Sequence, residues 1–526
     1  MNTAEEDEIA ADLVLGSVPE PSSRNLVDCV AAVAETNKRT IYLVAVTAVF
    51  VTFGISTSAS AFDQAVIQGY CQSHYDAISG SNDKGSPALD CSLPDILGPA
   101  SAFGSLLYTI LTVPSLVTSL FTGPLSDSYG RKPVLGAWFF GMLFDTLCPI
   151  LVVRFGVGMW ILAFGKLLLG ICGGISTPTM LLYSQLADVC APQDRSKFLG
   201  VLSGLAMLGS LSGMMVGGWL VKSTGSFEPT FIVSFFVMTA AFAYLVLVVP
   251  ETNRPRPASR SAPKEPLRVH AARSLRNTLA SLRKLPLVVL GVSLLDLGMR
   301  AGLVFLVPFY TAQVFNWKTW ENTLFSAENA ACMAITTMVV LPIVDRAVRR
   351  WVTRRQSREQ EGEPTGERER LIPSAGRRDD AEARDAEGKT LINASIGLFE
   401  LRLFVLLTAI HCALFALAQR DWMLFAIIPF QALGHLSAIA ARTLLLEFAA
   451  ADTYGTVNSS YGVLLSLTDM LVIKATSALF DLGSRTSAPT MVFWGLEALS
   501  LSAFAGTFLV TFRTSEAARN RRPAAA

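Results

Sequence analysis

The sequence has few charged side chains for its length. Charged residues make up 16% of its 526 residues, whereas soluble domains usually carry about 25%. Hydrophobic residues make up 51%, more than a single soluble core of this size would bury. Histidine occurs only four times, and the HExxH, GxSxG and P-loop patterns of common enzymes are missing. The composition therefore indicates a membrane protein that is not an enzyme.

The eight cysteines show no CxxC pattern and no zinc-like spacing, so we expect no metal site. The formal net charge of +1 gives no indication of a nucleic-acid partner. We also expect no bound cofactor.

Long apolar runs dominate what is present, each reaching the roughly 17–25 residues that a helix needs to cross a bilayer. We predict an all-α membrane protein of twelve spans, because backbone groups in lipid must hydrogen-bond internally. The expected spans are 40–62, 100–122, 134–153, 157–184, 198–221, 229–250, 286–312, 323–344, 401–419, 422–444, 457–479 and 490–512.

The distribution of Lys and Arg predicts the topology and the domain limits. With a cytosolic N-terminus, only six of the 43 Lys and Arg lie in expected external loops, as the positive-inside rule requires. The expected parts are a cytosolic tail (1–39), a six-helix bundle (40–250), a cytosolic linker (251–285), a second bundle (286–512) and a cytosolic C-terminal tail (513–526). Within the second bundle, residues 345–400 are rich in charge of both signs and are expected to be a disordered cytosolic insert.

A glycine-rich, basic loop joins the second and third expected spans. It reads GPLSDSYGRKP and contains Gly123, Asp127, Gly130, Arg131 and Lys132. This loop resembles the signature loop of the major facilitator superfamily (MFS), although Ser128 stands where the family usually has a basic residue. The resemblance implies an MFS fold with two pseudo-symmetric six-helix bundles that rock about a central site.

Two other loops carry the same resemblance. Asp188 and Arg195 are similar to the family's acidic and basic pair after the fourth helix, and Asp345, Arg346 and Arg349 are similar to a degenerate second copy of the signature loop. The resemblance implies that Asp127, Arg131, Asp188 and Arg195 form a cytosolic charge cluster that gates transport.

Glycines also gather in the fifth expected span, at Gly200, Gly209, Gly213, Gly217 and Gly218. Small residues along one helix face let a neighbouring helix approach closely. The eighth span offers a matching row at Ala327, Ala330, Ala331 and Ala334. The glycine pattern resembles a motif of drug/proton antiporters in this superfamily, although Met214 replaces its proline.

Ionisable residues within spans need partners or a function, because charge in the hydrocarbon is costly. The expected spans contain five carboxylates (Asp145, Asp296, Glu328, Asp469, Glu497) and three cations (Lys166, Arg300, Lys474). We expect Lys166 to pair with Asp145, and Asp296 with Arg300 four residues later. Two acids would then lack a basic partner and could carry protons, and we favour Glu328 and Asp469. The family's cavity-lining helices would place Lys166, Asp296, Arg300, Glu328, His435, Asp469 and Lys474 along the substrate and proton pathway.

Cys71 and Cys91 flank a polar external loop in which a disulfide would suit the oxidising side. Together with the signature loop, this pair resembles the proton-coupled folate transporter branch.

We therefore predict a monomeric secondary transporter that is coupled to the proton gradient and exports a drug or secondary metabolite. Alternatives are proton-coupled uptake of a nutrient or vitamin-like organic anion, and a membrane sensor that transports nothing. The expected location is the plasma membrane, with a vacuolar or endosomal membrane as the alternative because Glu367–Ile372 has an acidic-dileucine form.

Overall fold

The protein is built from helices that run side by side. The computed structural model describes residues 23–79, 90–189, 195–252, 287–341, 343–344, 346–348, 350, 375–447, 454–486 and 488–509, and every regular element among them is a helix. The first group comprises α2 (Ser23–Ser79), α3 (Pro94–Tyr129), α4 (Arg131–Phe155), α5 (Trp160–Ile171), α6 (Ser176–Val189), α7 (Arg195–Thr224) and α8 (Glu228–Leu247). The second comprises α10 (Leu287–Val314), α11 (Thr319–Ile335), the π-helix η2 (Thr336–Val340), α13 (Ala375–Leu417), α14 (Asp421–Glu447), α15 (Tyr454–Arg485) and α16 (Met491–Thr507).

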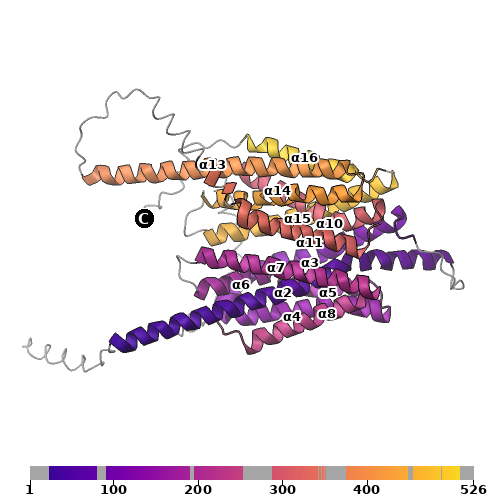
Figure 1. Cartoon of the computed structure of the whole chain (residues 1–526), viewed down its shortest axis with the longest axis horizontal. Helices are drawn as coiled ribbons and strands as arrows, with labels where there is room; N and C mark the ends of the chain where they lie inside the picture. The colour runs from indigo at the N-terminus through magenta and orange to yellow at the C-terminus, as the bar shows by residue number, and fades with distance from the viewer. Residues whose placement is uncertain are drawn as a thin grey trace, which may run out of the picture.

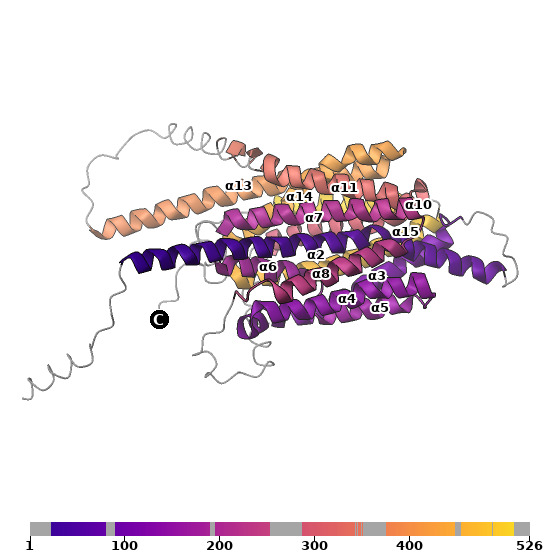
Figure 2. The same cartoon turned by 60° about the horizontal axis from the view of Figure 1, so that its bottom comes forward.

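Twelve apolar segments cross the molecule, which confirms the predicted fold class. Among the described residues, eleven helices are long and apolar enough to span a membrane, and Met491–Thr507 is a shorter apolar helix. Helices α2–α8 form one half and α10–α16 the other, seen as the indigo-to-magenta and orange-to-yellow groups of Figures 1 and 2. The halves meet mainly where α3 packs on α15 and where α7 packs on α11.

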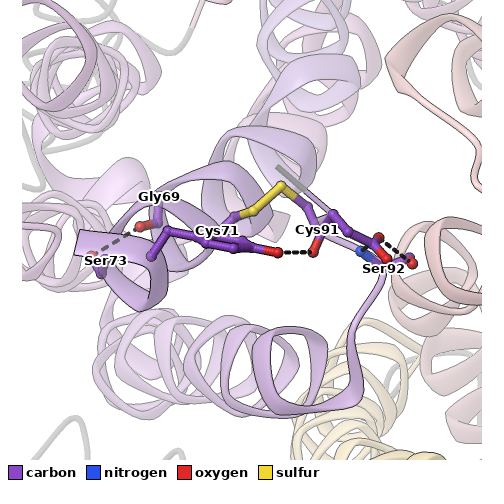
Figure 3. Close-up of a disulfide and its surroundings, with 7 residues drawn as sticks. Gly69, Cys71, Ser73, Cys91 and Ser92 are labelled. Atoms are coloured by element: carbon purple, nitrogen blue, oxygen red, sulfur yellow. Dashed lines mark hydrogen bonds between the residues drawn. A yellow bond between two sulfur atoms is a disulfide. The ribbon is translucent and has the colours of Figure 1, made fainter. Parts of the chain in front are cut away.

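The two ends of this helix array differ in chemistry. One end carries Gly130, which separates α3 from α4, and Arg131 and Lys132, the first residues of α4; it is called the basic end here. The opposite end carries a disulfide between Cys71 and Cys91, whose Cα atoms are 5.4 Å apart, and is called the disulfide end. Figure 3 shows that this bond ties α2 to the segment that leads into α3.

The disulfide segment is reinforced by hydrogen bonds next to it. Ser92 donates to Asp90 Oδ1 through both its amide nitrogen (3.0 Å) and its hydroxyl (2.6 Å). These bonds stabilise the carboxylate and lower the pKa of Asp90. On the other side of the disulfide, the Ser73 hydroxyl donates to Gly69 O at 3.0 Å within α2. The chain therefore turns into α3 with a fixed geometry.

The helix limits differ most from the sequence predictions in three places. The first apolar helix extends over Arg39–Ala77 rather than 40–62. Polar residues such as Asp63 and Gln64 are half-buried within it and do not end the helix. Within the predicted tail and the predicted disordered insert, the backbone is already helical from Ser23 and from Ala375. The segment from Ala375 is rich in Ala, Glu, Asp and Arg, among which Ala, Glu and Arg have high helix propensity.

The fourth span is broken in its middle rather than continuous. Gly173 and Gly174 have φ values of 120° and 68°, a conformation that glycine adopts readily, and they separate α5 from α6. Side chains satisfy the carbonyls near the break: Trp138 Nε1 donates to Gly174 O at 2.7 Å, and Thr177 Oγ1 donates to Gly173 O at 2.7 Å. Such a break is tolerated at membrane depth because protein groups replace the lost helical bonds.

The disulfide gives a direct test of this description. In the double variant Cys71→Ser/Cys91→Ser, loss of the link over a sequence separation of 20 should reduce stability by about 3 kcal/mol, because the unfolded chain gains freedom. The detergent-purified variant should therefore melt at a lower temperature than the wild type. Labelling of the denatured wild type with a maleimide polymer should show two more thiols after reduction than before. The control is Cys172→Ser, which removes a free cysteine and should still show two more thiols after reduction than before. A wild-type protein with the same number of thiols before and after reduction would contradict the disulfide.

Candidate functional site

Close contacts at the disulfide end hold the two halves together. On one side of the molecule, the hydroxyls of Ser101 on α3 and Ser477 on α15 are 3.2 Å apart. A Cβ atom at Gly98 would lie 2.1 Å from Asp481 Oδ1, so only glycine lets this carboxylate approach the start of α3. On the opposite side, Lys222 Nζ of α7 lies 4.2 Å from the ring centre of Trp320 on α11, a cation–π contact.

The distribution of the hydrophobic core shows which end is closed. One buried cluster at the disulfide end includes residues of both halves, such as Phe103 and Leu107 with Phe309 and Phe493. Toward the basic end the core divides into two clusters, each confined to one half. The halves are thus joined by shared apolar packing at the disulfide end and have separate cores toward the basic end.

Asp469 lies on α15, one of the helices at the contact between the halves. Its Oδ1 atom is buried and has no hydrogen-bond partner among the described residues. Tyr108 of α3, from the other half, is close enough for an electrostatic interaction with this carboxyl group. The Asp469 carboxyl group therefore lies next to the contact between the two halves.

In the N-terminal half, a lysine is surrounded by acidic and aromatic groups. Lys166 Nζ lies 2.8 Å from Asp145 Oδ2, which joins α5 to α4 as the sequence predicted. The ring of Phe62 on α2 lies 4.7 Å from the same nitrogen. Asp63, also on α2, interacts electrostatically with Lys166. Asp63 is missing from the predicted set because the first span was ended one residue before it.

In the C-terminal half, Arg300 connects three helices. Its Nη2 lies 2.9 Å from Asp296 Oδ2 on α10, 2.5 Å from Thr408 Oγ1 on α13 and 2.8 Å from Ser437 Oγ on α14. It also donates to Gly434 O, and the Ser437 hydroxyl donates to Asp296 Oδ2. The predicted ion pair is present and is held inside this half.

The remaining predicted pathway residues are dispersed. Glu328 is half-buried on α11, and His435 is half-buried on α14 near Arg300. Lys474 is exposed on α15, five residues after Asp469 and so on a different face of the helix. The structure does not bring these three residues together with Asp469 as one site.

At the basic end, the signature loop contacts Glu251, an acidic residue that was not among the predicted site residues. Arg131 Nε lies 3.2 Å from Asp188 Oδ2, so α4 and α6 are joined as the motif implied. Glu251 accepts hydrogen bonds from the backbone nitrogens of Arg131 (2.9 Å) and Lys132 (3.0 Å), the first residues of α4. The Lys132 ammonium group donates to the carbonyls of Val246 and Val249 at the end of α8. Opposite charges thus stabilise a helix N-terminus and a helix C-terminus in one place.

Some of the residues predicted for gating or helix packing lie wholly or partly outside the described structure. Asp345 and Arg349 lie outside the described residues, as do the side chains of Asp127 and Arg195 and the surroundings of Gly123 and Gly200. Arg346 is exposed at the basic end.

The glycine-rich helix α7 packs differently from the prediction. Cβ atoms at Gly209 and Gly213 would lie 2.8 Å from Val49 O and 2.3 Å from Phe53 O, so these glycines face α2 and not the alanine row. Gly218 does face α11, where Thr323 Oγ1 would lie 2.4 Å from its Cβ. The Gly217 carbonyl accepts a hydrogen bond from Thr230 Oγ1 of α8. The small residues therefore allow α7 to fit against three helices at once.

Comparison with known proteins agrees with this architecture. The sequence model of the Major Facilitator Superfamily matches residues 44–356. The chain belongs to this superfamily. It is a multi-pass membrane transporter and not an enzyme.

Individual relatives are distant. An uncharacterised membrane protein of Schizosaccharomyces pombe is 21% identical over 85% of this chain and 74% of its own length. The class H tetracycline resistance protein of Pasteurella multocida is 31% identical over 23% of this chain and 28% of its own length. The proton-coupled folate transporter of Bos taurus is 26% identical over 28% of this chain and 31% of its own length. The human organic anion transporter MFSD10 shares the fold, with a TM-score of 0.57 and 15% identity over 90% of this chain and 99% of its own.

The junction at Gly130 can be tested by substitution. Gly130 has φ 102°, and a Cβ there would lie 2.6 Å from Glu251 Oε2. Gly130→Ala should therefore displace the Glu251 carboxylate from the start of α4 and reduce stability by about 2 kcal/mol, through backbone strain and lost charge-assisted bonds. The melting temperature of the purified protein measures this loss.

Gly136→Ala in the same helix is the matched control, because its Cβ would meet only Phe242 at 3.7 Å. The control should melt like the wild type. Equal melting temperatures for the two variants would show that the Gly130–Glu251 contact does not contribute to stability.

Proposed function

We propose that the protein exports a small organic molecule in exchange for protons, by alternating access between its two halves. The observation that carries this proposal is the buried Oδ1 of Asp469, which has no hydrogen-bond partner among the described residues and lies on α15 where this helix packs on α3. A carboxyl group can bind and release a proton, and a proton on it removes a charge that is costly to bury. Asp469 is placed where that change of charge would alter the packing of one half on the other.

Two buried acids, Asp145 and Asp296, support this choice because each is paired with a cation, although Asp296 Oδ1 also lacks a hydrogen-bond partner among the described residues. Asp145 is paired with Lys166, and Asp296 is paired with Arg300. Such pairs neutralise their charge inside the protein. Asp469 is therefore a better proton carrier than either of them. Glu328, the second candidate from the sequence, is half-buried on α11 and remains the alternative.

The proposed orientation places the basic end in the cytosol and the disulfide end outside. The Lys and Arg distribution of the sequence favours this orientation, and an external disulfide suits the oxidising side. The described packing, closed at the disulfide end, would then be an inward-facing state. We propose a monomer in the plasma membrane that uses the proton gradient and no cofactor.

Export of a drug or secondary metabolite is favoured by the similarity to a tetracycline resistance protein. The second candidate function is proton-coupled uptake of an organic anion, favoured by the similarity to a folate transporter. Arg300, a cation of the kind that binds organic anions, already contacts Asp296, Thr408 and Ser437. This engagement weakens the argument for uptake. Flux in liposomes would separate both transport functions from a sensor.

The substitution Asp469→Asn tests the proton role. In proteoliposomes with an acidic lumen, the wild type should accumulate at least one member of a panel of labelled drugs that begins with tetracycline. Asp469→Asn should reduce gradient-driven accumulation by about tenfold or more, because the amide cannot carry the proton. Exchange of labelled for unlabelled compound without a gradient should persist, since it needs no proton transfer.

The control is Glu497 on α16, a helix that packs mainly on α13 and α10 of its own half. Glu497→Gln should transport like the wild type. Full gradient-driven accumulation by Asp469→Asn would refute the assigned proton carrier. A wild-type protein that moves no compound of the panel, in either direction, would refute export.

A further inference from the structure

A small cavity lies inside the C-terminal half, between α10, α13 and α14. Its lining includes Met299, Arg300, Thr408, His411, Cys412 and Gln431. All of these residues belong to one half, so the cavity is separate from the contact between the halves where Asp469 lies. None of the proposed transport steps uses it.

Polar atoms that line this cavity are not satisfied by the protein. Arg300 Nε, His411 Nε2 and Gln431 Oε1 are buried and have no hydrogen-bond partner among the described residues. The His411 side chain is only 2% exposed. An orphan buried polar atom costs about 1–3 kcal/mol, so three of them around one cavity indicate a bound group that completes their hydrogen bonds.

The chemistry of the lining limits what this group can be. Arg300 Nε can only donate, whereas Gln431 Oε1 can only accept. The ligand must therefore both accept and donate hydrogen bonds. An anion would lie beside the Asp296 carboxylate that already binds Arg300, and a cation would lie beside the Arg300 guanidinium. A neutral molecule that donates and accepts, and is small enough for a cavity within a helix bundle, is water.

We propose that this cavity is an internal hydration site, in which ordered water bridges Arg300, His411 and Gln431. Buried water typically makes about three hydrogen bonds to polar groups that lack protein partners. Water at this position would partly solvate the Arg300–Asp296 pair, whose desolvation is the main cost of burying it. It would also give α10, α13 and α14 hydrogen bonds that rearrange easily when the half changes shape.

The N-terminal half provides matched controls in the same molecule. Its lysine is covered by the ring of Phe62, and Cys148 beside it is 3% exposed, against 2% for Cys412. Met238, within the apolar cluster of this half, is 0% exposed, against 1% for Met299. Cys412 and Met299 therefore each have a control of the same chemical type and similar burial.

Hydroxyl-radical footprinting by X-ray radiolysis of the full-length protein in nanodiscs tests the proposal. Radicals formed from bound water oxidise neighbouring side chains even when bulk solvent does not reach them. Cys412 and Met299 should be oxidised at least about threefold faster than Cys148 and Met238, because only the first pair borders internal water. Radiolysis in ¹⁸O-labelled water should place the label on the same two residues.

Two variants identify the site. Gln431→Leu and His411→Phe should each lower the Cys412 and Met299 rates to those of the controls, by removing the polar partners of the water. The wild-type comparison stands on its own if either variant fails to fold. Rates for Cys412 and Met299 that stay within about threefold of the controls in the wild-type protein would overturn the proposal. This outcome would leave the role of Asp469 untouched.

Discussion

The cost of placing charge inside a bilayer governs the arrangement of this protein. A charged side chain at membrane depth must find a partner, or the span that carries it will not be stable. Lys166 and Arg300 each meet this requirement through a carboxylate and further contacts within their own half. These clusters join helices within a half. The described contacts between the halves are made by hydroxyls, glycines and apolar side chains, with Lys222 against the Trp320 ring and Asp481 against Gly98.

This division of interactions is suited to alternating access. Strong, buried ion pairs keep each six-helix half together, whereas the contact between the halves is made of packing that can be exchanged. The shared core at the disulfide end and the separate cores toward the basic end describe one end state of such a motion. Asp469 differs from the paired acids Asp145 and Asp296 because it lies on α15, a helix of the contact between the halves.

The sequence predicted what depends on long patterns and failed where packing decides. The length of the apolar runs predicted the spans, and the need of a charge within a span for a partner predicted the Lys166–Asp145 ion pair. Asp63 was missed because a polar residue after an apolar run resembles the end of a span, although this helix continues to Ala77. Glu251 was missed because it is distant in sequence from the α4 N-terminus that it caps. The partner of Gly209 and Gly213 depends on helix order in space, which glycine spacing does not encode.

The most direct test of this account measures two distances between spin labels on the two halves by double electron–electron resonance. Labels at the exposed positions Phe155 and Trp422 report on the disulfide end, and labels at Leu247 and Ile343 report on the basic end. The account predicts opposite changes when a proton gradient and a transported compound are supplied: the first distance lengthens as the second shortens. Two distances that stay fixed, or change in the same direction, while the protein transports would contradict movement of the halves about a shared contact.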